Sequence, residues 1–335
     1  MKKILFVSSI LLFFSGCTKV ILGDVPPNNP ESVFENFCEQ INNSYAGKDV
    51  RGVNWDSLYK TYSPKINTQT NNSQLISVFQ AMMSPFGDRH LDLKINGSSL
   101  ASATSNSDYL NSQALEKSLN KSLKGYKNIF GYAVTANNIG YVAINTFDKY
   151  RFSQSDFEFF DIILDEMKDT KGLIIDIRTN GGGEELYAQL IAGRFTATPQ
   201  LYKYTRAKIG VNKTDYTDFF SFTLQPRGTT YTKPVVVLTG NYTYSTANNF
   251  LMMLRLLPNI TTIGNATGDG VVGSTTRELP NGWLLQCPSG LAFLPDKTAV
   301  EGSGGIKPKI QVSISAADKT NNVDAILNKA LDLMK

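Results

Sequence analysis

The chain has 335 residues, of which 41% are apolar and 11% aromatic, enough for about two domains with buried cores. This composition excludes a disordered or fibrous protein. The chain carries 33 Lys and Arg residues against 29 Asp and Glu, a net charge of +4, and lacks the clustered basic face that a nucleic-acid partner requires. A single histidine, His90, and three cysteines do not supply a zinc site, so we expect no metal and no cofactor.

The N-terminus has the pattern of a bacterial lipoprotein leader. Two lysines precede an apolar run over residues 4–14, which is shorter than the ~20 residues that span a bilayer. The run ends in Phe-Ser-Gly-Cys, which resembles a lipobox, so we expect residues 1–16 to be a signal peptide and Cys17 to be acylated. Residues 17–28 would then tether the protein to the bacterial cell envelope, at the outer membrane, on its periplasmic or surface face. An ordinary secretory signal, with Cys17 incidental, is the alternative.

The other two cysteines, Cys38 and Cys287, would share an oxidising compartment, where they could form a disulfide. Cys38, however, lies on the apolar face of a predicted helix with Phe34, Phe37 and Ile41, which favours a buried free thiol. We assign neither cysteine a catalytic role, and their pairing stays open.

Residues 29–97 are predicted to form a small N-terminal helical cap domain. Asn29-Pro30 is typical of an N-cap followed by the first helical residue. Apolar residues at three- and four-residue spacing indicate further helices around 55–62 and 75–83. An alternating stretch, 91–95, predicts a strand after them.

Residues 98–128 begin with a Ser/Asn-rich stretch and are expected to be a linker segment, followed by a larger domain over 129–335. Within that domain, the continuous apolar runs 173–177 and 235–238 are typical of strands covered on both faces. A capping box at 155–158 indicates the start of a helix before the first of these strands. We therefore expect an α/β domain with a mostly parallel sheet.

Each of these two buried strands is followed by residues that a purely structural turn would not need. After the first, Gly181, Gly182 and Gly183 let backbone N–H groups point outward, which suits a phosphate or an oxyanion. No P-loop lysine or dinucleotide fingerprint accompanies them. After the second, Ser245 precedes a helix, either as a plain N-cap or with its hydroxyl beside the N–H of Thr246, where the helix dipole stabilises an oxyanion.

Together these segments resemble the carboxy-terminal processing (tail-specific) and tricorn core serine peptidases. The matching motifs are Asp-Arg-His at 88–90, Leu-Ile-Ile-Asp-Ile-Arg-x-Asn-Gly-Gly-Gly at 173–183, Leu-Thr-x-x-x-x-Tyr-Ser-x-Ala at 238–247, and Glu-Gly followed by Gly-Ile-Lys-Pro at 301–308. The resemblance implies a crotonase-like ββα-spiral serine peptidase core at residues 129–335.

The resemblance also implies the site residues. It makes Ser245 the nucleophile and assigns the amides of Gly182 and Thr246 to the oxyanion hole. The tail-specific branch uses a Lys base about one strand after the serine, but the corresponding region of this chain contains no Lys. The tricorn-like branch instead uses a histidine before the core, which is His90, and a glutamate near its end, which is Glu301.

The chain departs from the tricorn-like pattern at two positions. Arg89 replaces a serine that bridges the histidine to the glutamate, so Glu301 either orients His90 or forms an ion pair with Arg89. Asn248 stands where the family often has an acidic residue. The segment between residues 90 and 140 is also too short for a PDZ domain of ~100 residues.

The expected function is hydrolysis of peptide bonds in peptides or unfolded proteins, through an acyl-enzyme on Ser245 with His90 as the general base. The alternative is a non-catalytic ligand- or peptide-binding protein on the same scaffold, because the fold family includes carriers. An acyl-CoA enzyme of related fold is not supported, because no nucleotide-binding segment is found. The oligomeric state stays open.

Overall fold

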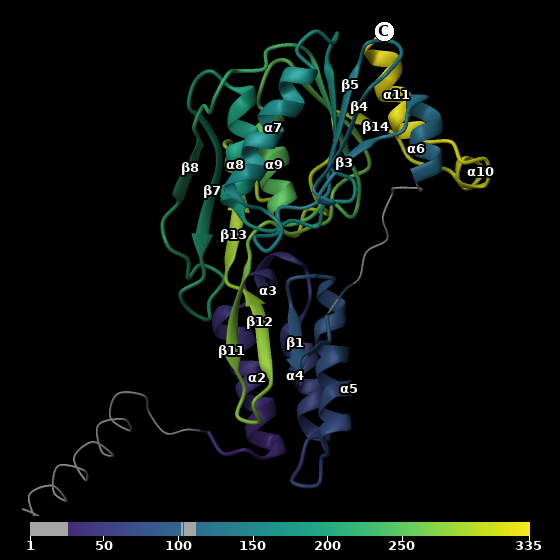
Figure 1. Ribbon diagram of the computed structural model, residues 1–335. Coiled ribbons are helices and arrows are strands. Elements are labelled where there is room, and N and C mark those ends of the chain that lie inside the picture. The colour runs from purple at the N-terminus through teal and green to yellow at the C-terminus, as the bar shows by residue number, and fades with distance from the viewer. Residues whose placement is uncertain (1–25, 102, 104–111) are drawn as a thin grey trace, which may run out of the picture.

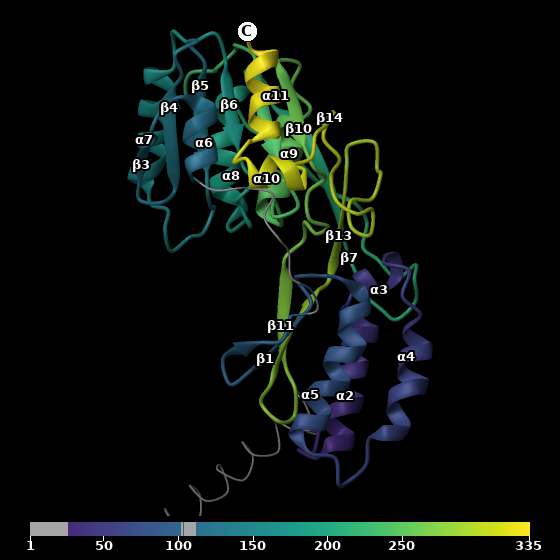
Figure 2. The same cartoon turned by 90° about the vertical axis from the view of Figure 1, so that its right-hand side faces the viewer.

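The computed structural model describes residues 26–101, 103 and 112–335. The predicted leader and Cys17 lie outside these ranges, as does most of the Ser/Asn-rich stretch. Within the described ranges, no helix is both long and apolar enough to cross a membrane. The molecule is elongated, with the N-terminal helices at one end and a larger α/β part at the other (Figures 1 and 2).

A seven-stranded sheet forms the centre of the larger part, in the order β14-β10-β9-β6-β5-β4-β3. Its strands are β3 (Lys124–Tyr126), β4 (Phe130–Val134), β5 (Gly140–Ile144), β6 (Leu173–Asp176), β9 (Val235–Thr239), β10 (Ile260–Gly264) and β14 (Ile310–Gln311). Strands β5, β6, β9, β10 and β14 run parallel, and β4 and β3 are added antiparallel at one edge. β6 and β9 are buried along their whole length, which explains their unbroken apolar sequences. The predicted α/β fold with a mostly parallel sheet is confirmed.

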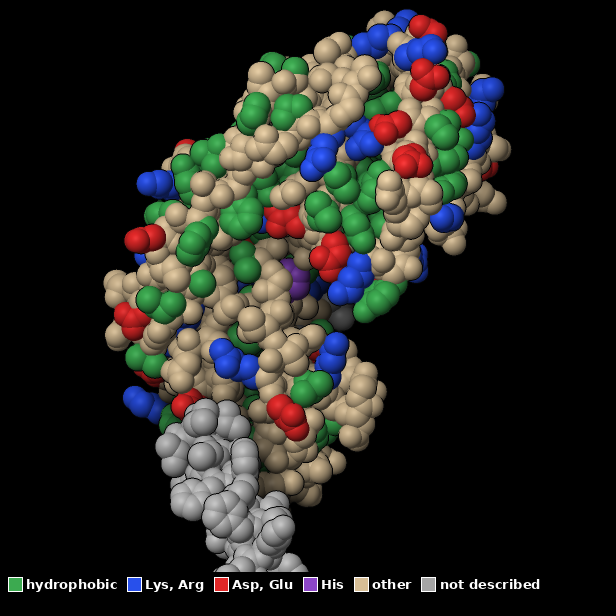
Figure 3. All heavy atoms as spheres, turned by 60° about the vertical axis from the view of Figure 1, so that its left-hand side comes forward, with side chains coloured by type: hydrophobic (Ala, Val, Ile, Leu, Met, Phe, Trp, Pro, Cys, Tyr) green, Lys and Arg blue, Asp and Glu red, His purple; other side chains and the backbone are tan. Residues whose placement is uncertain are grey.

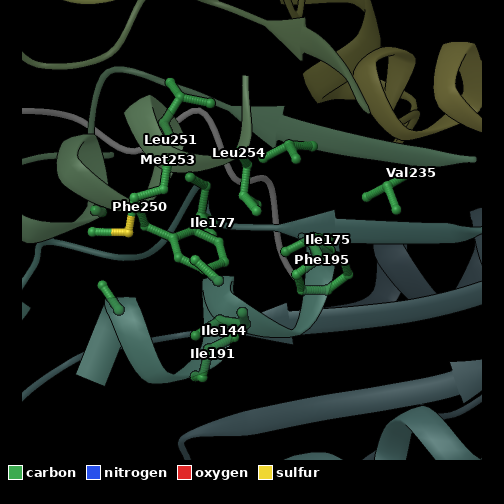
Figure 4. Close-up of a cluster of buried hydrophobic side chains, with 14 of the residues drawn as sticks. Ile144, Ile175, Ile177, Ile191, Phe195, Val235, Phe250, Leu251, Met253 and Leu254 are labelled. Carbon is green, nitrogen blue, oxygen red and sulfur yellow. The ribbon is translucent and has the colours of Figure 1, made fainter. Parts of the chain in front are cut away.

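Helices cover both faces of this sheet (Figure 2). One face packs against α7 (Gln154–Glu166), α8 (Glu185–Ala192) and α9 (Thr246–Leu254); the other packs against α6 (Ser112–Leu119) and α11 (Ala325–Leu333), which follows α10 (Ala316–Thr320). Figure 4 shows the first of these cores, where Ile175 and Val235 of the sheet lie in one cluster with Ile191 of α8 and Phe250 and Leu254 of α9. This packing holds the starts of α8 and α9 side by side, beyond the ends of β6 and β9.

Helix α7 begins earlier than the sequence indicated. The capping box is formed by Ser153 and Asp156, not by the predicted pair 155–158, and the helix starts at Gln154. The Ser153 backbone N–H and hydroxyl both donate to the Asp156 carboxylate, and Lys127 forms an ion pair with it at 2.9 Å. The predicted pair was wrong because Ser155 offers the same local spacing without these partners.

The smaller part contains the predicted helices and strand. They are α2 (Pro30–Ser44), α3 (Gly47–Val50), α4 (Trp55–Tyr62), α5 (Asn72–Met83), β1 (Asp92–Ile95) and β2 (Ser98–Ser99). The Asn29 side chain accepts the Ser32 N–H at 2.8 Å and caps α2, as predicted. Short 3-10 turns follow α4, α5 and α8, at Ser63–Lys65, Ser84–Phe86 and Gly193–Phe195.

A hairpin from late in the chain completes the smaller part. Its strands, β11 (Ser274–Glu278) and β12 (Leu284–Pro288), extend away from the α/β part and form a sheet in the order β11-β12-β1-β2 (Figure 1). Trp283, Leu285 and Cys287 of the hairpin lie in the same hydrophobic cluster as Phe79 and Cys38. Cys38 and Cys287 are both free, and burial raises the pKa of both thiols well above the ordinary range.

Two further features complete the fold. A third sheet, in the order β13-β7-β8, lies beside α9 and consists of β7 (Gln200–Ala207), β8 (Phe220–Leu224) and β13 (Gly290–Phe293). The segment expected to be a linker, 98–128, carries α6 and the edge strand β3 of the central sheet. Its C-terminal half is therefore part of the α/β core.

Candidate active site

Ser245 lies in a sharp turn between β9 and α9. Its backbone has φ 56° and ψ −124°, a conformation that strains any residue with a side chain. The Ser245 N–H donates to the Gly270 carbonyl at 3.0 Å, and the Tyr244 N–H donates to the Asn180 carbonyl at 3.2 Å, which holds the turn from two sides. The Ser245 side chain makes no capping hydrogen bond to α9. Its hydroxyl is therefore not used as a plain N-cap.

Thr246 is the first residue of α9, and its backbone N–H has no acceptor among the described residues. An unpaired N–H at the positive end of a helix is suited to stabilise an oxyanion. The Thr246 hydroxyl donates to the Gly183 carbonyl, which fixes the start of α9 against the glycine turn after β6.

The glycine turn approaches Ser245 too closely for a larger residue. A Cβ atom on Gly182 would lie 2.8 Å from the Cβ of Ser245. The Gly182 N–H, an oxyanion-hole donor by the family resemblance, donates instead to the Asn180 side-chain oxygen at 2.9 Å. The N–H of Gly183 has no acceptor in the part of the chain that the structure describes. Gly183 is thus a second candidate donor, and the run of three glycines did not distinguish it from Gly182.

A buried ion-pair cluster lies next to the glycine turn. Arg178 pairs with Asp176 at 2.6 Å and with Asp324 at 2.8 Å, and all three side chains are almost fully buried. Asp324 also caps α11, since its carboxylate accepts the Leu327 N–H at 3.0 Å. The cluster connects the end of β6 to α11 and so holds the start of the glycine turn in place.

His90 lies beside the residue that precedes Ser245. Its ring centroid is 4.4 Å from that of Tyr244, and its side chain makes no hydrogen bond to Ser245 or to Glu301 among the described residues. Burial lowers the pKa of His90 to about 4; Asp88 opposes this shift, and Arg89 and Arg51 reinforce it. The imidazole is therefore neutral at pH 7 and able to accept a proton. It is visible in a recess between the two parts of the molecule (Figure 3).

Asp88 fixes the loop that carries His90. Its carboxylate accepts the His90 N–H at 2.9 Å, the Tyr45 hydroxyl at 2.9 Å and the Tyr244 hydroxyl at 3.1 Å. Arg51 forms an ion pair with Asp88 at 3.3 Å and with Asp269 at 3.4 Å. This network joins the helical part, His90 and the segment before Ser245. Asp88 and Tyr244 belong to two of the sequence motifs, but their contact was not predicted, and Arg51 lies outside every motif.

Comparison with known proteins identifies the family. Residues 138–312, more than half of the chain, match peptidase family S41, and residues 26–84 match the Tricorn protease C1 domain. The chain belongs to peptidase family S41. It is thus a hydrolase of the serine-peptidase type, and the predicted resemblance to the tail-specific and tricorn peptidases is confirmed.

One sequence relative and two solved structures support this assignment. The chain is 27% identical over 179 residues to the Tricorn protease of Thermoplasma acidophilum, which is 53% of this chain but only 15% of that much longer protein. It resembles the crystal structure of a candidate peptidase from Parabacteroides merdae with a TM-score of 0.83 and 28% identity, covering 92% of this chain and 97% of that one. It also shares its fold with mature CPAF, with a TM-score of 0.66 at 13% identity, over 91% of this chain and 98% of that one.

In this S41 family member, Glu301 contacts the loop after β10, which holds the Ser245 turn, rather than His90. Its carboxylate accepts the backbone N–H groups of Val271 at 3.3 Å, Val272 at 3.1 Å and Ala292 at 2.6 Å. Burial raises the pKa of Glu301 to about 7, although hydrogen bonds from the backbone N–H groups of Ala292, Glu301 itself and Val272 oppose the shift. Neither contact that the sequence suggested for Glu301, with His90 or with Arg89, is present among the described residues.

Arg89 and Asn248, the two departures from the family pattern, each have a defined place. The Arg89 guanidinium lies 3.7 Å from the ring centroid of Tyr244 and donates to the Asn241 carbonyl at 3.1 Å. The Asn248 amide donates to the carbonyls of Gly268 and Gly270, both at 2.8 Å. An ionised aspartate at position 248 could donate neither bond, so the amide suits this loop better than an acid.

Proposed function

We propose that this protein hydrolyses peptide bonds through an acyl-enzyme on Ser245, with His90 as the general base. His90 accepts the proton of the Ser245 hydroxyl as its oxygen attacks the substrate carbonyl, and then gives it to the departing amine. A water molecule cleaves the resulting ester, with His90 again accepting the proton. The N–H groups of Thr246 and of Gly182 or Gly183 stabilise the oxyanion in both steps.

The observation that carries this proposal is the turn at Ser245. The backbone is strained, the hydroxyl does not cap the helix that follows, and the adjacent Thr246 N–H has no acceptor among the described residues. Strain of about 1–3 kcal/mol at one residue persists only where the surroundings enforce it, and it is typical of functional sites.

His90 is the second support, because it is the only imidazole of the chain and burial keeps it neutral. Its ring contacts Tyr244, the neighbour of Ser245. In this proposal, the hydrogen bond between His90 and Ser245 forms when the substrate binds, since catalytic hydrogen bonds often tighten only in the complex. Glu301 has a positioning role in this proposal: it holds the loop whose Gly270 carbonyl binds Ser245.

The test is digestion of a peptide library by the mature protein, with the products identified by mass spectrometry. Ser245→Ala should abolish cleavage and leave the fold intact. Ser315→Ala is the matched control, because Ser315 accepts the Asp318 N–H at 3.1 Å and does cap a helix, α10. That control should lose about 1 kcal/mol of stability and keep full activity. Undiminished cleavage by Ser245→Ala would remove Ser245 from the mechanism.

A non-catalytic peptide- or ligand-binding protein on the same scaffold is the second candidate. Two observations favour it: the described residues include no hydrogen bond between His90 and Ser245, and the Gly182 N–H is already bonded to Asn180. Tight, saturable binding of peptides that the wild-type protein leaves uncut after long incubation would support this candidate over the enzyme.

We also propose that the mature protein begins at an acylated Cys17 and is anchored to the bacterial cell envelope, with the helical cap and the peptidase core as its two domains. Mass spectrometry of the mature amino terminus tests the anchor. A diacylated or triacylated Cys17 is expected, and Cys17→Ser should release the protein or leave its leader uncleaved. An unmodified terminus at another residue would refute the anchor.

A further inference from the structure

Arg51 comes from the helical part of the molecule, directly after α3, and its side chain is only 6% exposed. Its guanidinium reaches two loops. Toward the loop that carries His90, the Nε atom lies 3.3 Å from the Asp88 carboxylate, and Nη1 donates to the Phe86 carbonyl at 3.3 Å. Toward the loop between β10 and β11, Nη1 donates to the Asp269 carboxylate at 3.4 Å and Nη2 to the Asp269 carbonyl at 2.8 Å. One buried guanidinium thus makes four contacts with two loops.

The first loop holds the candidate base. The Asp88 carboxylate accepts the His90 N–H at 2.9 Å and the Tyr244 hydroxyl at 3.1 Å. The Asp88 side chain is only 4% exposed, and a buried carboxylate is stable only beside groups that compensate its charge. Arg51 supplies the positive charge. The position of Asp88, and with it that of His90, therefore depends on Arg51.

The second loop holds the nucleophile turn. Asp269 lies between two glycines, and both of them bond to the segment around Ser245. The Gly268 N–H donates at 2.9 Å to the carbonyl two residues before the serine. The Gly270 carbonyl accepts the Ser245 N–H at 3.0 Å. The contacts of Arg51 with Asp269 thus act on the middle of the loop that fixes the turn.

A close approach between the two parts of the molecule fixes Asp269 and Arg51 relative to each other. The Asp269 carboxylate accepts the Gly302 N–H at 2.9 Å. Gly302 has φ 77°, a conformation that favours glycine, and a Cβ atom there would lie 2.5 Å from the carbonyl oxygen of Val50. Val50 is the residue before Arg51. The main chain that carries Arg51 is therefore packed against the segment that binds Asp269.

We propose that Arg51 is a positioning residue of the peptidase reaction, which holds the loop of His90 and the loop behind Ser245 at the separation that proton transfer requires. The inference rests on the proposed peptidase function. Arg51 acts through Asp88 and Asp269, which its guanidinium joins. Lysine cannot replace it, because a single ammonium group cannot reach two carboxylates and two carbonyls at once. The helical part is then required for catalysis, in addition to stability.

Arg51 also contributes to the charge around His90. The charged groups that act on the imidazole are Asp88 and Arg89 from its own loop and Arg51 from the helical part. Tyr244, from the turn before α9, presents a ring whose hydroxyl stays neutral because burial raises its pKa. Burial lowers the pKa of His90, Asp88 opposes this shift, and the two arginines reinforce it. Loss of the Arg51 charge should therefore raise the pKa of His90.

The experiment compares Arg51→Lys, which keeps the charge and loses most of the contacts, with Arg51→Met, which loses both. We expect each variant to lower kcat for peptide cleavage about 100-fold, because a displacement of about 1 Å at the reacting groups has an effect of this size. KM should change less than about threefold, since Arg51 is buried away from solvent. The rise of kcat/KM with pH should stay near pH 4 in Arg51→Lys and move up by about half a pH unit or more in Arg51→Met. A purely structural role would not separate the two pH profiles.

Two further variants complete the experiment. Arg194→Lys is the matched control, because Arg194 is also buried, bonds to the Asp161 carboxylate at 2.7 Å, and lies after the end of α8 that is remote from the glycine turn. It should keep the wild-type kcat and pH profile. Asp269→Asn tests the same contact from the other side, also where an Arg51 variant does not fold, and should lower kcat at least about tenfold. Combined with Arg51→Lys, it should add less than about twofold, because both changes remove one shared contact.

Labelling of Ser245 by a fluorophosphonate, with circular dichroism of every variant, separates the possible failures. A wild-type protein that neither labels nor cleaves would overturn the peptidase function, and this role with it. A wild-type protein that does both, with wild-type kcat in folded Arg51→Lys or Asp269→Asn, would overturn the positioning role alone. Independent, multiplying losses in the double variant, or an equal loss of kcat in Arg194→Lys, would overturn it as well.

Discussion

At Ser245, local strain and function coincide. The backbone conformation is one that glycine adopts at no steric cost, yet the chain places a serine there. Two hydrogen bonds, from Tyr244 to Asn180 and from Ser245 to Gly270, hold the strained turn. A serine used only to cap α9 would adopt an extended backbone and accept an N–H of the first turn, and Ser245 does neither.

Ser245→Gly should therefore be more stable than Ser245→Ala. Glycine relieves the strain, whereas alanine keeps it, so we expect a difference in the free energy of unfolding of about 1 kcal/mol, reduced by the greater entropy of glycine in the unfolded chain. Urea denaturation of both variants measures this difference. Equal stabilities, or a more stable alanine variant, would show that the turn is not strained.

The pKa of His90 predicts the pH dependence of the reaction. A base with a pKa of about 4 is already deprotonated at pH 6, so kcat/KM should rise with pH through about 4 and stay level through neutrality. His90→Ala should lower kcat at least ~10³-fold with the fold retained. A rise centred near pH 6.5, the ordinary value for histidine, would mean that the ring is solvated in the working enzyme.

At the scale of elements, one carboxylate holds the loop between β10 and β11, whose Gly270 carbonyl accepts the Ser245 N–H. Glu301 accepts the N–H groups of Val271 and Val272 from that loop and of Ala292 from β13. It therefore joins the sheet β13-β7-β8 to the segment that holds the nucleophile turn. The Asn248 amide of α9 also donates hydrogen bonds to this loop, at the carbonyls of Gly268 and Gly270.

Glu301 should make stability depend on pH. Its folded pKa is raised from 4.5 to about 7, so between these values the folded protein holds a proton that the unfolded chain has released. The free energy of unfolding therefore falls as pH rises through this window. His90, with its pKa lowered from 6.5 to about 4, has the opposite effect between pH 4 and 6.5.

Glu301→Gln removes the first of these two contributions. Its free energy of unfolding should rise more steeply than that of the wild type between pH 4.5 and 6.5, and should not fall between pH 6.5 and 7. Urea unfolding at intervals of half a pH unit gives both curves. Parallel curves would show that Glu301 is ionised in the folded protein at all these pH values.

At the scale of the whole molecule, the hairpin β11–β12 joins the two parts. It pairs with β1, which follows His90, and the Ser274 hydroxyl of β11 donates to the His90 carbonyl at 2.6 Å. Trp283, near the start of β12, packs edge-on against Phe79 of α5 at 6.2 Å between ring centroids. The position of His90 thus depends on the packing of the hairpin within the cap.

Trp283→Ala should lower the free energy of unfolding by about 3–5 kcal/mol, because it leaves a cavity in the cluster that the hairpin and the helices share. It should also reduce kcat/KM, since β1 and the loop of His90 lose part of their support. Leu333→Ala, at a side chain that is 48% exposed, is the control and should change the free energy of unfolding by less than about 1 kcal/mol. Full activity in Trp283→Ala would show that the hairpin does not position His90.

These observations also show what could be predicted from the sequence. Local patterns suffice for the buried strands β6 and β9, for the cap helices and for the turn at Ser245, because apolar periodicity and glycine placement act over a few residues. The partners of Glu301 and Asp88 were not predicted, because they come from segments far apart in the chain. The hairpin was missed for the same reason: its pairing with β1 joins residues 92–94 to residues 284–286.

The most direct test of the central claim is reaction of the mature wild-type protein with a fluorophosphonate, followed by mass spectrometric mapping of the modified residue. We predict a single phosphonylated site at Ser245, absent in Ser245→Ala and formed much more slowly in His90→Ala, because both the nucleophile and its base are needed. A protein that does not react, or that is modified at another serine to the same extent in Ser245→Ala, would contradict the account.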